Sequence, residues 1–209
     1  MKPYLTKTPR IVQRLYKNYT WCFFTDKKEI YLTFDDGPTA EITDWTLDLL
    51  DTYNAKATFF CIGKNIVEEP EIYARILTKN HQIGNHTHNH KKGSKTDLKS
   101  YVNNILEAEK HLENPSKLFR PPYGRIKRKQ AQKIKSLGYK IIMWDVLSAD
   151  FDTTITKEKC LQNVLKNTKK GSIIVFHDSL KASKNLQYTL PKVLEYYSKK
   201  GYVFKAINS

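Results

Sequence analysis

Apolar runs and amphipathic segments alternate along most of the chain. Short runs rich in β-branched and aromatic residues predict strands, and apolar residues spaced three or four apart predict helices. The predicted strands lie at 29–34, 57–62, 82–85, 117–119, 139–144, 172–177 and 202–206. The predicted helices lie at 41–53, 70–79, 96–112, 127–137, 157–169 and 186–200. This alternation predicts an α/β fold.

Three of the predicted helices end in the same way. Lysines near the helix end are followed by a glycine and then by an apolar run, at Gly138, Gly171 and Gly201. Glycine readily adopts the left-handed conformation that ends a helix, and lysine favours the negative end of the helix dipole. Regular helix-then-strand order favours parallel strands with helical crossovers. We therefore predict a distorted (β/α) barrel of about seven parallel strands, buried on both faces.

The first residues lie outside this alternation. We predict an N-terminal extension over residues 1–28, with a short amphipathic helix within 9–20 that places Ile11 and Leu15 on one face. The main domain is then expected over residues 29–209.

The composition is that of a folded chain, with 40% hydrophobic and 27% charged residues and a net charge of +15. The excess of Lys and Arg is expected mainly on solvated helix faces, with attraction to an anionic polymer as the alternative. No stripe of Arg interleaved with aromatic residues supports specific nucleic-acid binding. No apolar run approaches the roughly 20 residues of a transmembrane span. No secretory signal is visible, so the cytoplasm is the default compartment.

Ionisable residues gather where predicted strands end. Five separate strands are followed by Asp35 and Asp36, His86, Arg120, Asp145, and His177. In parallel α/β folds, ligands bind beyond the carboxyl ends of the strands. Two adjacent carboxylates after an apolar strand are costly to bury unpaired, so a metal ion or a cationic partner is expected beside them.

Two histidines offer ligands for such a metal. His86 and His90 are four residues apart, which would place both imidazoles on one face of a helical turn. With one carboxylate from Asp35 and Asp36, the donors become two His and one Asp, and coordination positions stay open for water and substrate. We expect one divalent metal ion, zinc by default; cobalt, nickel and iron also suit these ligands.

The remaining polar residues suit acid–base chemistry. The second aspartate can take a proton from a metal-bound water, and Arg120 can pair with that base and orient it. His177 can protonate a leaving group, and Asp150 can hold its imidazole and raise its pKa. Each residue alone is more often structural, but their shared position at the strand ends favours the catalytic interpretation.

The order and spacing of these residues resemble the polysaccharide deacetylases with a NodB-homology domain, carbohydrate esterase family four. The resemblance covers residues 29–206 and implies a NodB-like catalytic domain over 29–209. The stretch Thr33–Pro38 resembles the first motif of the family, which implies Asp35 as the base and Asp36 as a metal ligand.

Two further motifs follow in the expected order. The stretch His86–His90 resembles the second motif, and its first and last histidines would be metal ligands. The stretch Arg120–Tyr123 resembles the third motif. There Arg120 would orient Asp35, and the backbone N–H of Tyr123 would help to hold the oxyanion.

The last two motifs differ in how well they match. Val175 and His177 match the fifth motif, which implies a valine beside the acetyl methyl and a histidine as the general acid. The fourth motif keeps Asp150, the partner of that histidine. It has Leu147 where the family usually has an aspartate and Phe151 where it usually has a tryptophan, so the wall of the substrate groove is altered.

The resemblance implies a hydrolase that removes N-acetyl groups from a glycan containing N-acetylglucosamine, of the peptidoglycan or chitin type, through attack of a metal-bound water. Two alternatives remain open. An O-acetyl esterase acting on a xylan-type polysaccharide would use the same residues, and a protein of this fold could bind glycans without catalysis. Members of the family are often exported, which conflicts with the default compartment and leaves it open.

Overall fold

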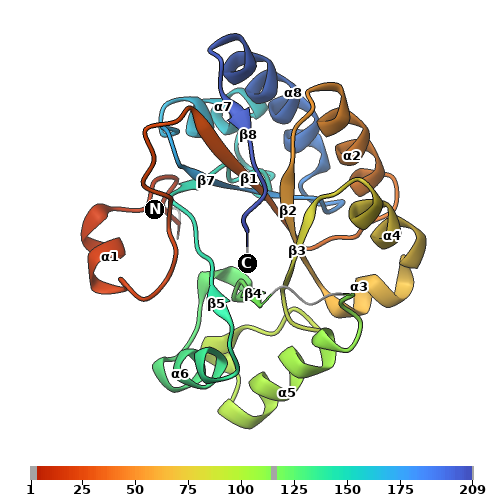
Figure 1. Cartoon of the computed structure of the whole chain (residues 1–209), viewed down its shortest axis with the longest axis vertical. Helices are drawn as coiled ribbons and strands as arrows, with labels where there is room; N and C mark the ends of the chain where they lie inside the picture. Colours follow the sequence, from red (N-terminus) through yellow and green to blue (C-terminus); the bar gives the residue numbers. More distant parts are fainter. Residues whose placement is uncertain (1–3, 114–116, 209) are drawn as a thin grey trace.

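The structure of the chain is a computed structural model that describes residues 4–113 and 117–208 (Figure 1). Its strands are β1 (Glu29–Asp35), β2 (Ala57–Cys61), β3 (Gln82–Asn85), β4 (Leu118–Phe119), β5 (Lys140–Ile141), β6 (Val146–Leu147), β7 (Ile173–His177) and β8 (Val203–Phe204). Its α-helices are α1 (Arg10–Leu15), α2 (Ile42–Thr52), α3 (Gly63–Glu68), α4 (Pro70–Thr78), α5 (Leu98–Glu109), α6 (Arg128–Ser136), α7 (Lys157–Leu165) and α8 (Ser183–Lys199). Two short 3-10 helices are η1 (Gly93–Lys95) and η2 (Pro122–Gly124).

The strands form one curled sheet. Seven of them follow the order β5-β4-β3-β2-β1-β7-β6, and β8 pairs with the beginning of β1 off this path. Every strand pair among the described residues is parallel. Figure 1 shows α2, α4, α5, α6, α7 and α8 arranged around the outside of the curl. The predicted α/β fold of about seven parallel strands is confirmed, as a half-barrel.

The central strands are buried on both faces, as their unbroken apolar runs predicted. Phe34 of β1 stacks against Phe59 and Phe176 of its two neighbours, with ring centroids 5.0 and 6.0 Å apart, in the larger core cluster. Phe60, the next residue of β2, points the other way and packs with Leu118 in a separate cluster. In the part of the chain that the structure describes, no helix has both the length and the apolar character needed to cross a bilayer.

The prediction of a single strand over 139–144 is wrong. Only Lys140–Ile141 of this segment forms a strand, β5, beside β4; the chain then leaves the sheet and joins it again at β6, beside β7, so that β5 and β6 lie at the two ends of the sheet. Between them the chain crosses the open side of the curl: Ile142 N–H donates to Phe119 O (2.9 Å), and Asp145 N–H donates to Ile173 O (3.3 Å). The crossing is buried from both sides, so its apolar sequence resembles one continuous strand.

The N-terminal extension also lies across this open side. The expected apolar face of α1 is exposed, with Ile11 at 61% and Leu15 at 72%, so the helix does not use that face for packing. The extension is attached by the residues that follow: Thr20 N–H donates to Ile141 O (2.9 Å), and Met143 N–H donates to Thr20 O (2.7 Å). The boundary between an extension over 1–28 and a domain over 29–209 stays a prediction, and both ranges include residues outside the described ones.

Gly171 fixes a contact between the extension and the sheet, and it allows a test. Its φ is +75°, and a Cβ there would lie 1.8 Å from Phe23 O. We predict that Gly171→Ala lowers the free energy of unfolding by about 3 kcal/mol or more, because backbone strain and a clash with main chain act together.

Gly201→Ala is the matched control for this substitution. Gly201 has nearly the same φ, +74°, but a Cβ there would meet nothing closer than Lys28 Nζ at 3.9 Å. It should therefore lose only about 1 kcal/mol from backbone strain. Urea unfolding measures both variants, and equal losses would contradict the close packing of the extension.

Candidate active site

The carboxyl ends of β1, β3, β4 and β7 meet at one end of the half-barrel, beside a groove of about 550 Å³. The groove is lined by Tyr4, Asp35, Asp36, His86, His90, Lys92, Tyr123, Gly124, Arg125, Trp144, Leu147, Phe151, Val175, His177, Ser179 and Lys181. Eight of the ten predicted site residues are in this lining, and the other two, Arg120 and Asp150, lie fully buried behind it. The structure therefore brings all ten together.

Asp35, the last residue of β1, is paired with Arg120. Arg120 Nη1 donates to Asp35 Oδ1 (2.6 Å) and to Thr33 Oγ1 (2.7 Å), and both partners of the ion pair are buried. Burial alone would raise the pKa of Asp35, but the charge of Arg120 outweighs it, with His86 and His177 adding to the effect, and the pKa is lowered. Asp35 is therefore ionised at neutral pH.

The other donors of Arg120 bind the segment that crosses the open side of the sheet. Nε donates to Ile142 O (3.2 Å), and Nη2 donates to Met143 O (3.0 Å). The guanidinium also lies 4.1 Å from the centroid of the Phe60 ring. One side chain thus joins the end of β1 to the segment that crosses the open side of the sheet.

Asp36 turns away from Asp35 because its backbone leaves the strand conformation. Its φ is +84°, which aspartate tolerates better than most residues. Its Oδ1 lies 3.2 Å from His90 Nε2 and 3.7 Å from His86 Nε2. Asn65 Nδ2 donates to Asp36 O (2.7 Å) and fixes the turn. Within residues 4–113 and 117–208, no donor hydrogen-bonds the buried Oδ1 of Asp36.

The two histidines meet, but not on a helical turn as predicted. They belong to a loop after β3 in which Thr87 and His90 have φ of +65° and +50°. Asn104, from α5, accepts the N–H groups of His88 (3.1 Å) and Asn89 (3.0 Å) through its side-chain oxygen and so holds this loop. The spacing of four residues therefore predicted the pair of histidines that meet, but a loop rather than a helical turn brings them together.

The arrangement of both imidazoles suits metal binding. His86 Nδ1 lies 2.8 Å from Arg120 O, and because a carbonyl can only accept, Nδ1 is the donor in this bond and Nε2 is the nitrogen that faces Asp36. Burial and the neighbouring His86 lower the pKa of His90 to about 4, so its ring is neutral at pH 7. A backbone partner on the far nitrogen is what metal-binding histidines usually have.

Asp36, His86 and His90 fit a divalent metal ion. Their ligand atoms all lie within 4.8 Å of one another. The unpartnered carboxylate oxygen and the two imidazoles form a set of one oxygen and two nitrogen donors, which suits zinc and its neighbours in the first transition row. This donor set confirms that the strand ends bring the predicted ligands together; the identity of the metal stays a prediction.

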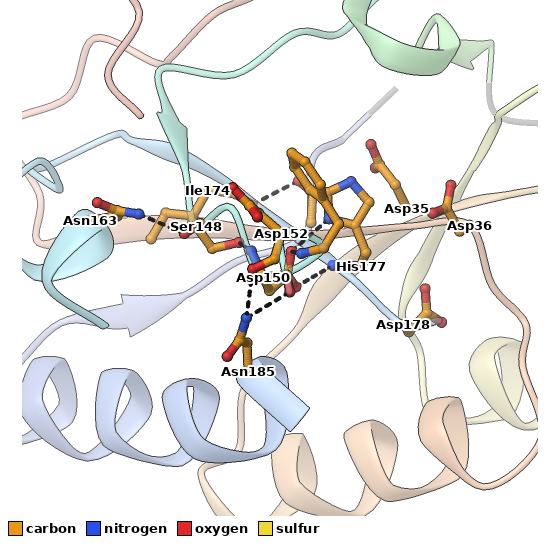
Figure 2. Close-up of polar contacts among 12 residues, drawn as sticks. Asp35, Asp36, Ser148, Asp150, Asp152, Asn163, Ile174, His177, Asp178 and Asn185 are labelled. Carbon is orange, nitrogen blue, oxygen red and sulfur yellow. Dashed lines mark hydrogen bonds and ion pairs between the residues drawn. The ribbon is translucent and has the colours of Figure 1, made fainter. Parts of the chain in front are cut away.

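His177, at the end of β7, faces the groove beside Asp35, its register partner in β1. Asp150 accepts from His177 twice, at Nδ1 (2.7 Å) and at the backbone N–H (2.7 Å) (Figure 2). Burial disfavours the charged ring, but the charge and hydrogen bond of Asp150 outweigh it and raise the pKa of His177 to about 9. His177 therefore holds a proton at neutral pH.

Asp150 itself is held by side chains from the surrounding helices. Asn185 of α8 donates to Asp150 O (3.0 Å), and Asn163 of α7 donates to Ser148 O (3.0 Å), as Figure 2 shows. No motif in the sequence pointed to these two asparagines, because they lie on helices whose remaining pattern is ordinary. Both amides are buried, and buried amides need hydrogen-bond partners, but this burial is visible only in the structure.

The remaining predicted residues form the walls of the groove. Val175 is buried, and the ring of Tyr123, whose φ is +61°, packs at a tilt against His90 with centroids 4.6 Å apart. Phe151 packs edge-on to His177, with centroids 5.0 Å apart. On its other side Phe151 contacts Tyr4, at 5.4 Å. Sequence analysis missed Tyr4, which lies far from every motif along the chain.

Three cationic side chains, Lys92, Arg125 and Lys181, also line the groove. They place part of the positive charge of the chain at the position where a substrate would lie. Attraction to an anionic polymer nevertheless stays a prediction, as does the absence of specific nucleic-acid binding.

Comparison with known proteins agrees with the fold and the set of side chains. A family model described as polysaccharide deacetylase matches residues 24–142, more than half of the chain. The chain belongs to this family, as its motifs predicted.

One relative and two solved structures show how similar this chain is to individual proteins. A peptidoglycan-N-acetylglucosamine deacetylase from Bacillus cereus is 35% identical over 193 residues, which are 90% of this chain and 91% of that protein. The solved structure of the Bc1960 peptidoglycan N-acetylglucosamine deacetylase superposes with a TM-score of 0.87 at 32% identity, over 96% of this chain and 95% of that one. The Xyl-CE4 domain of a multidomain xylanase from the hindgut metagenome of Trinervitermes trinervoides superposes with a TM-score of 0.79 at 30% identity, over 87% and 88%.

The pair of His177 and Asp150 predicts a pH dependence. Because the pKa of His177 in the folded chain, about 9, lies above the ordinary 6.5, the pair stabilises the fold fully below pH 6.5, and this stabilisation is lost as the pH rises through about 9. NMR titration of the imidazole in metal-free protein should give a pKa near 9, and Asp150→Asn should lower it, because the largest effect that opposes burial is lost and only the weaker charges of Asp36 and Asp35 remain. An unchanged pKa in the variant would contradict the pairing.

Proposed function

We propose that this protein is a metal-dependent hydrolase that removes N-acetyl groups from a glycan containing N-acetylglucosamine. One observation carries the proposal: two adjacent carboxylates are separated into different environments. Asp35 is bound by Arg120 and ionised. Asp36 faces two imidazoles, His86 and His90, with an oxygen that no donor in the described chain satisfies. A base beside a metal site is what hydrolysis of an amide by water requires.

Asp36, His86 and His90 would hold the metal ion. Zinc is the metal that we expect first, and cobalt, nickel and iron suit the same donors. When bound, the ion would polarise the acetyl carbonyl and a water molecule. Three protein ligands leave room in its coordination sphere, which is the arrangement of catalytic rather than structural sites.

The other residues would move the protons. Asp35 takes a proton from the attacking water, whose oxygen bonds to the acetyl carbon. The Tyr123 N–H helps to hold the resulting oxyanion. His177, protonated at neutral pH, gives its proton to the sugar nitrogen as the C–N bond breaks. The products are acetate and a glycan with a free amine, and Asp150 keeps His177 oriented throughout.

The names of the relatives support the substrate class. The Bacillus cereus protein and the solved Bc1960 structure are both peptidoglycan N-acetylglucosamine deacetylases, and each shares about a third of its residues with this chain over nearly its whole length. In this proposal Val175 lies beside the acetyl methyl. Phe151 forms the groove wall beside His177, where a smaller ring replaces the usual tryptophan.

An O-acetyl esterase acting on a xylan-type polysaccharide is the second candidate. The observation that favours it is the likeness to the Xyl-CE4 domain of a xylanase, with a TM-score of 0.79. The same residues would carry out the reaction, with an oxygen in place of the nitrogen as the leaving atom. Acetate release from acetylxylan, with none from chitin oligomers or peptidoglycan, would favour this candidate over the first.

Two substitutions separate the base from the metal site. Asp35→Asn should lower acetate release from peptidoglycan by about 10²–10⁴-fold while the metal content stays unchanged, because only the proton acceptor is lost. His86→Ala should lose both the metal and the activity. Metal analysis and an acetate assay on the same samples measure both quantities.

Asp48→Asn is the control for these variants, because Asp48 pairs with Arg75 and Lys79 on the surface, outside the groove lining. It should keep full activity and metal content. Thermal unfolding should show that each variant is folded at the assay temperature. Full activity of Asp35→Asn would contradict its assignment as the base, and metal-loaded wild-type protein that binds glycan without releasing acetate would indicate a non-catalytic binding protein.

A further inference from the structure

The first described residues, 4–8, are attached along the edge of the sheet. Lys7 forms an antiparallel bridge with Val146 of β6, and Leu147 N–H donates to Thr6 O (3.0 Å). Lys7 Nζ donates to the buried carboxylate of Asp145 (2.7 Å) and forms an ion pair with it. The segment is therefore a fixed part of the half-barrel at β6.

This segment reaches the active site. The Tyr4 ring packs edge-on to Phe151, which in turn packs edge-on to His177. The Tyr4 hydroxyl hydrogen-bonds the carboxylate of Asp152. Tyr4 thus lines the groove, although it lies outside every motif of the family along the sequence.

A second hollow of about 530 Å³ lies beside the groove, over this segment. Both hollows share the lining residues Tyr4, Tyr123, Gly124, Arg125, Trp144 and Leu147. The second hollow adds Leu5, Thr8, Pro9, Val12, Trp21 and Met143. Its size falls in the range of roughly 300–1,000 Å³ that is typical of small-ligand sites. The six shared residues make the two hollows direct neighbours on the surface of the half-barrel.

The chemistry of the second hollow suits a sugar ring. Trp21, Tyr4 and Val12 offer aromatic and apolar surface, against which the C–H face of a pyranose can pack. Arg125 and the Thr8 hydroxyl belong to the same lining; Arg125 can donate to ring hydroxyls, and the Thr8 hydroxyl, which donates to Trp144 O, can accept from them. The hollow contains no ligand set for a second metal, since the described residues offer only one such group, at Asp36.

We propose that the N-terminal segment forms a subsite for a second sugar unit of the same glycan chain whose acetyl group lies at His177. The proposal rests on the proposed function, because that function places a sugar in the first hollow. A glycan bound in the first hollow would extend past the residues that line both hollows and enter the second one. The segment would therefore make the enzyme prefer glycans long enough to occupy both hollows, through tighter binding rather than faster chemistry.

Leu5→Asp tests the subsite. Leu5 lines only the second hollow and is 62% exposed, so the fold tolerates the change, while a carboxylate disfavours an apolar sugar face. Leu15→Asp is the matched control, because Leu15 is 72% exposed in the same extension and lines neither hollow. The probes are N-acetylglucosamine and its β-1,4-linked oligomers of increasing length, and acetate release is measured for each.

The expected result is a selective loss on long oligomers. Leu5→Asp should raise KM for the longest oligomer by about tenfold with kcat unchanged, a loss of roughly 1.4 kcal/mol of binding. It should leave the monosaccharide N-acetylglucosamine, which fills only the first hollow, unaffected, and Leu15→Asp should match the wild type at every length. Equal behaviour of the two variants, or a loss that is the same at every length, would overturn the proposal.

Calorimetric binding of the longest oligomer separates this proposal from the proposed function. Wild-type protein that binds the oligomer without releasing acetate would refute the proposed function. In that case, weaker binding of the oligomer by Leu5→Asp than by wild type would still support the subsite. Acetate release with equal oligomer affinity in wild type, Leu5→Asp and Leu15→Asp would refute the subsite and leave the proposed function intact.

Discussion

A buried arginine holds the candidate active site together. Arg120 is the largest side chain that is fully buried, and removing such a charge from water costs several kcal/mol. The cost is offset because its donors meet Asp35, Thr33 and the carbonyl groups of Ile142 and Met143. Loss of one charged partner from a buried pair typically costs about 3–5 kcal/mol, because the other charge is left uncompensated. The half-barrel thus depends on a polar contact at the point where its sheet is open.

The same residue links the proposed base to the proposed metal site. Its guanidinium holds Asp35, and its backbone oxygen accepts from His86 Nδ1, so that the opposite nitrogen of the ring faces Asp36. The two carboxylates of the strand end therefore differ in role because of their surroundings. Asp36 is separated from Asp35 by a positive φ and by the amide of Asn65 rather than by the alternation of a strand alone.

The sequence predicted the fold and the gathering of ionisable side chains at one end of the sheet, because both depend on where apolar strands end. Ionisable residues after strands are visible in one dimension, and a parallel sheet brings them to one edge. Geometry that depends on tertiary contacts was not visible. His90 was placed on a helical turn, although the loop is shaped by Asn104. The crossing at Ile142 was taken for the middle of one strand, and Tyr4 was missed because its contacts are more than a hundred residues away.

Metal titration tests the central claim most directly, which is that Asp36, His86 and His90 hold a metal on which activity depends. Protein stripped by a chelator would be reloaded with increasing zinc, and bound metal and acetate release from peptidoglycan would be measured on each sample. The account predicts that activity rises in proportion to occupancy and saturates at one ion per chain, with negligible release from the stripped protein. Full acetate release by protein shown to contain no metal would contradict it.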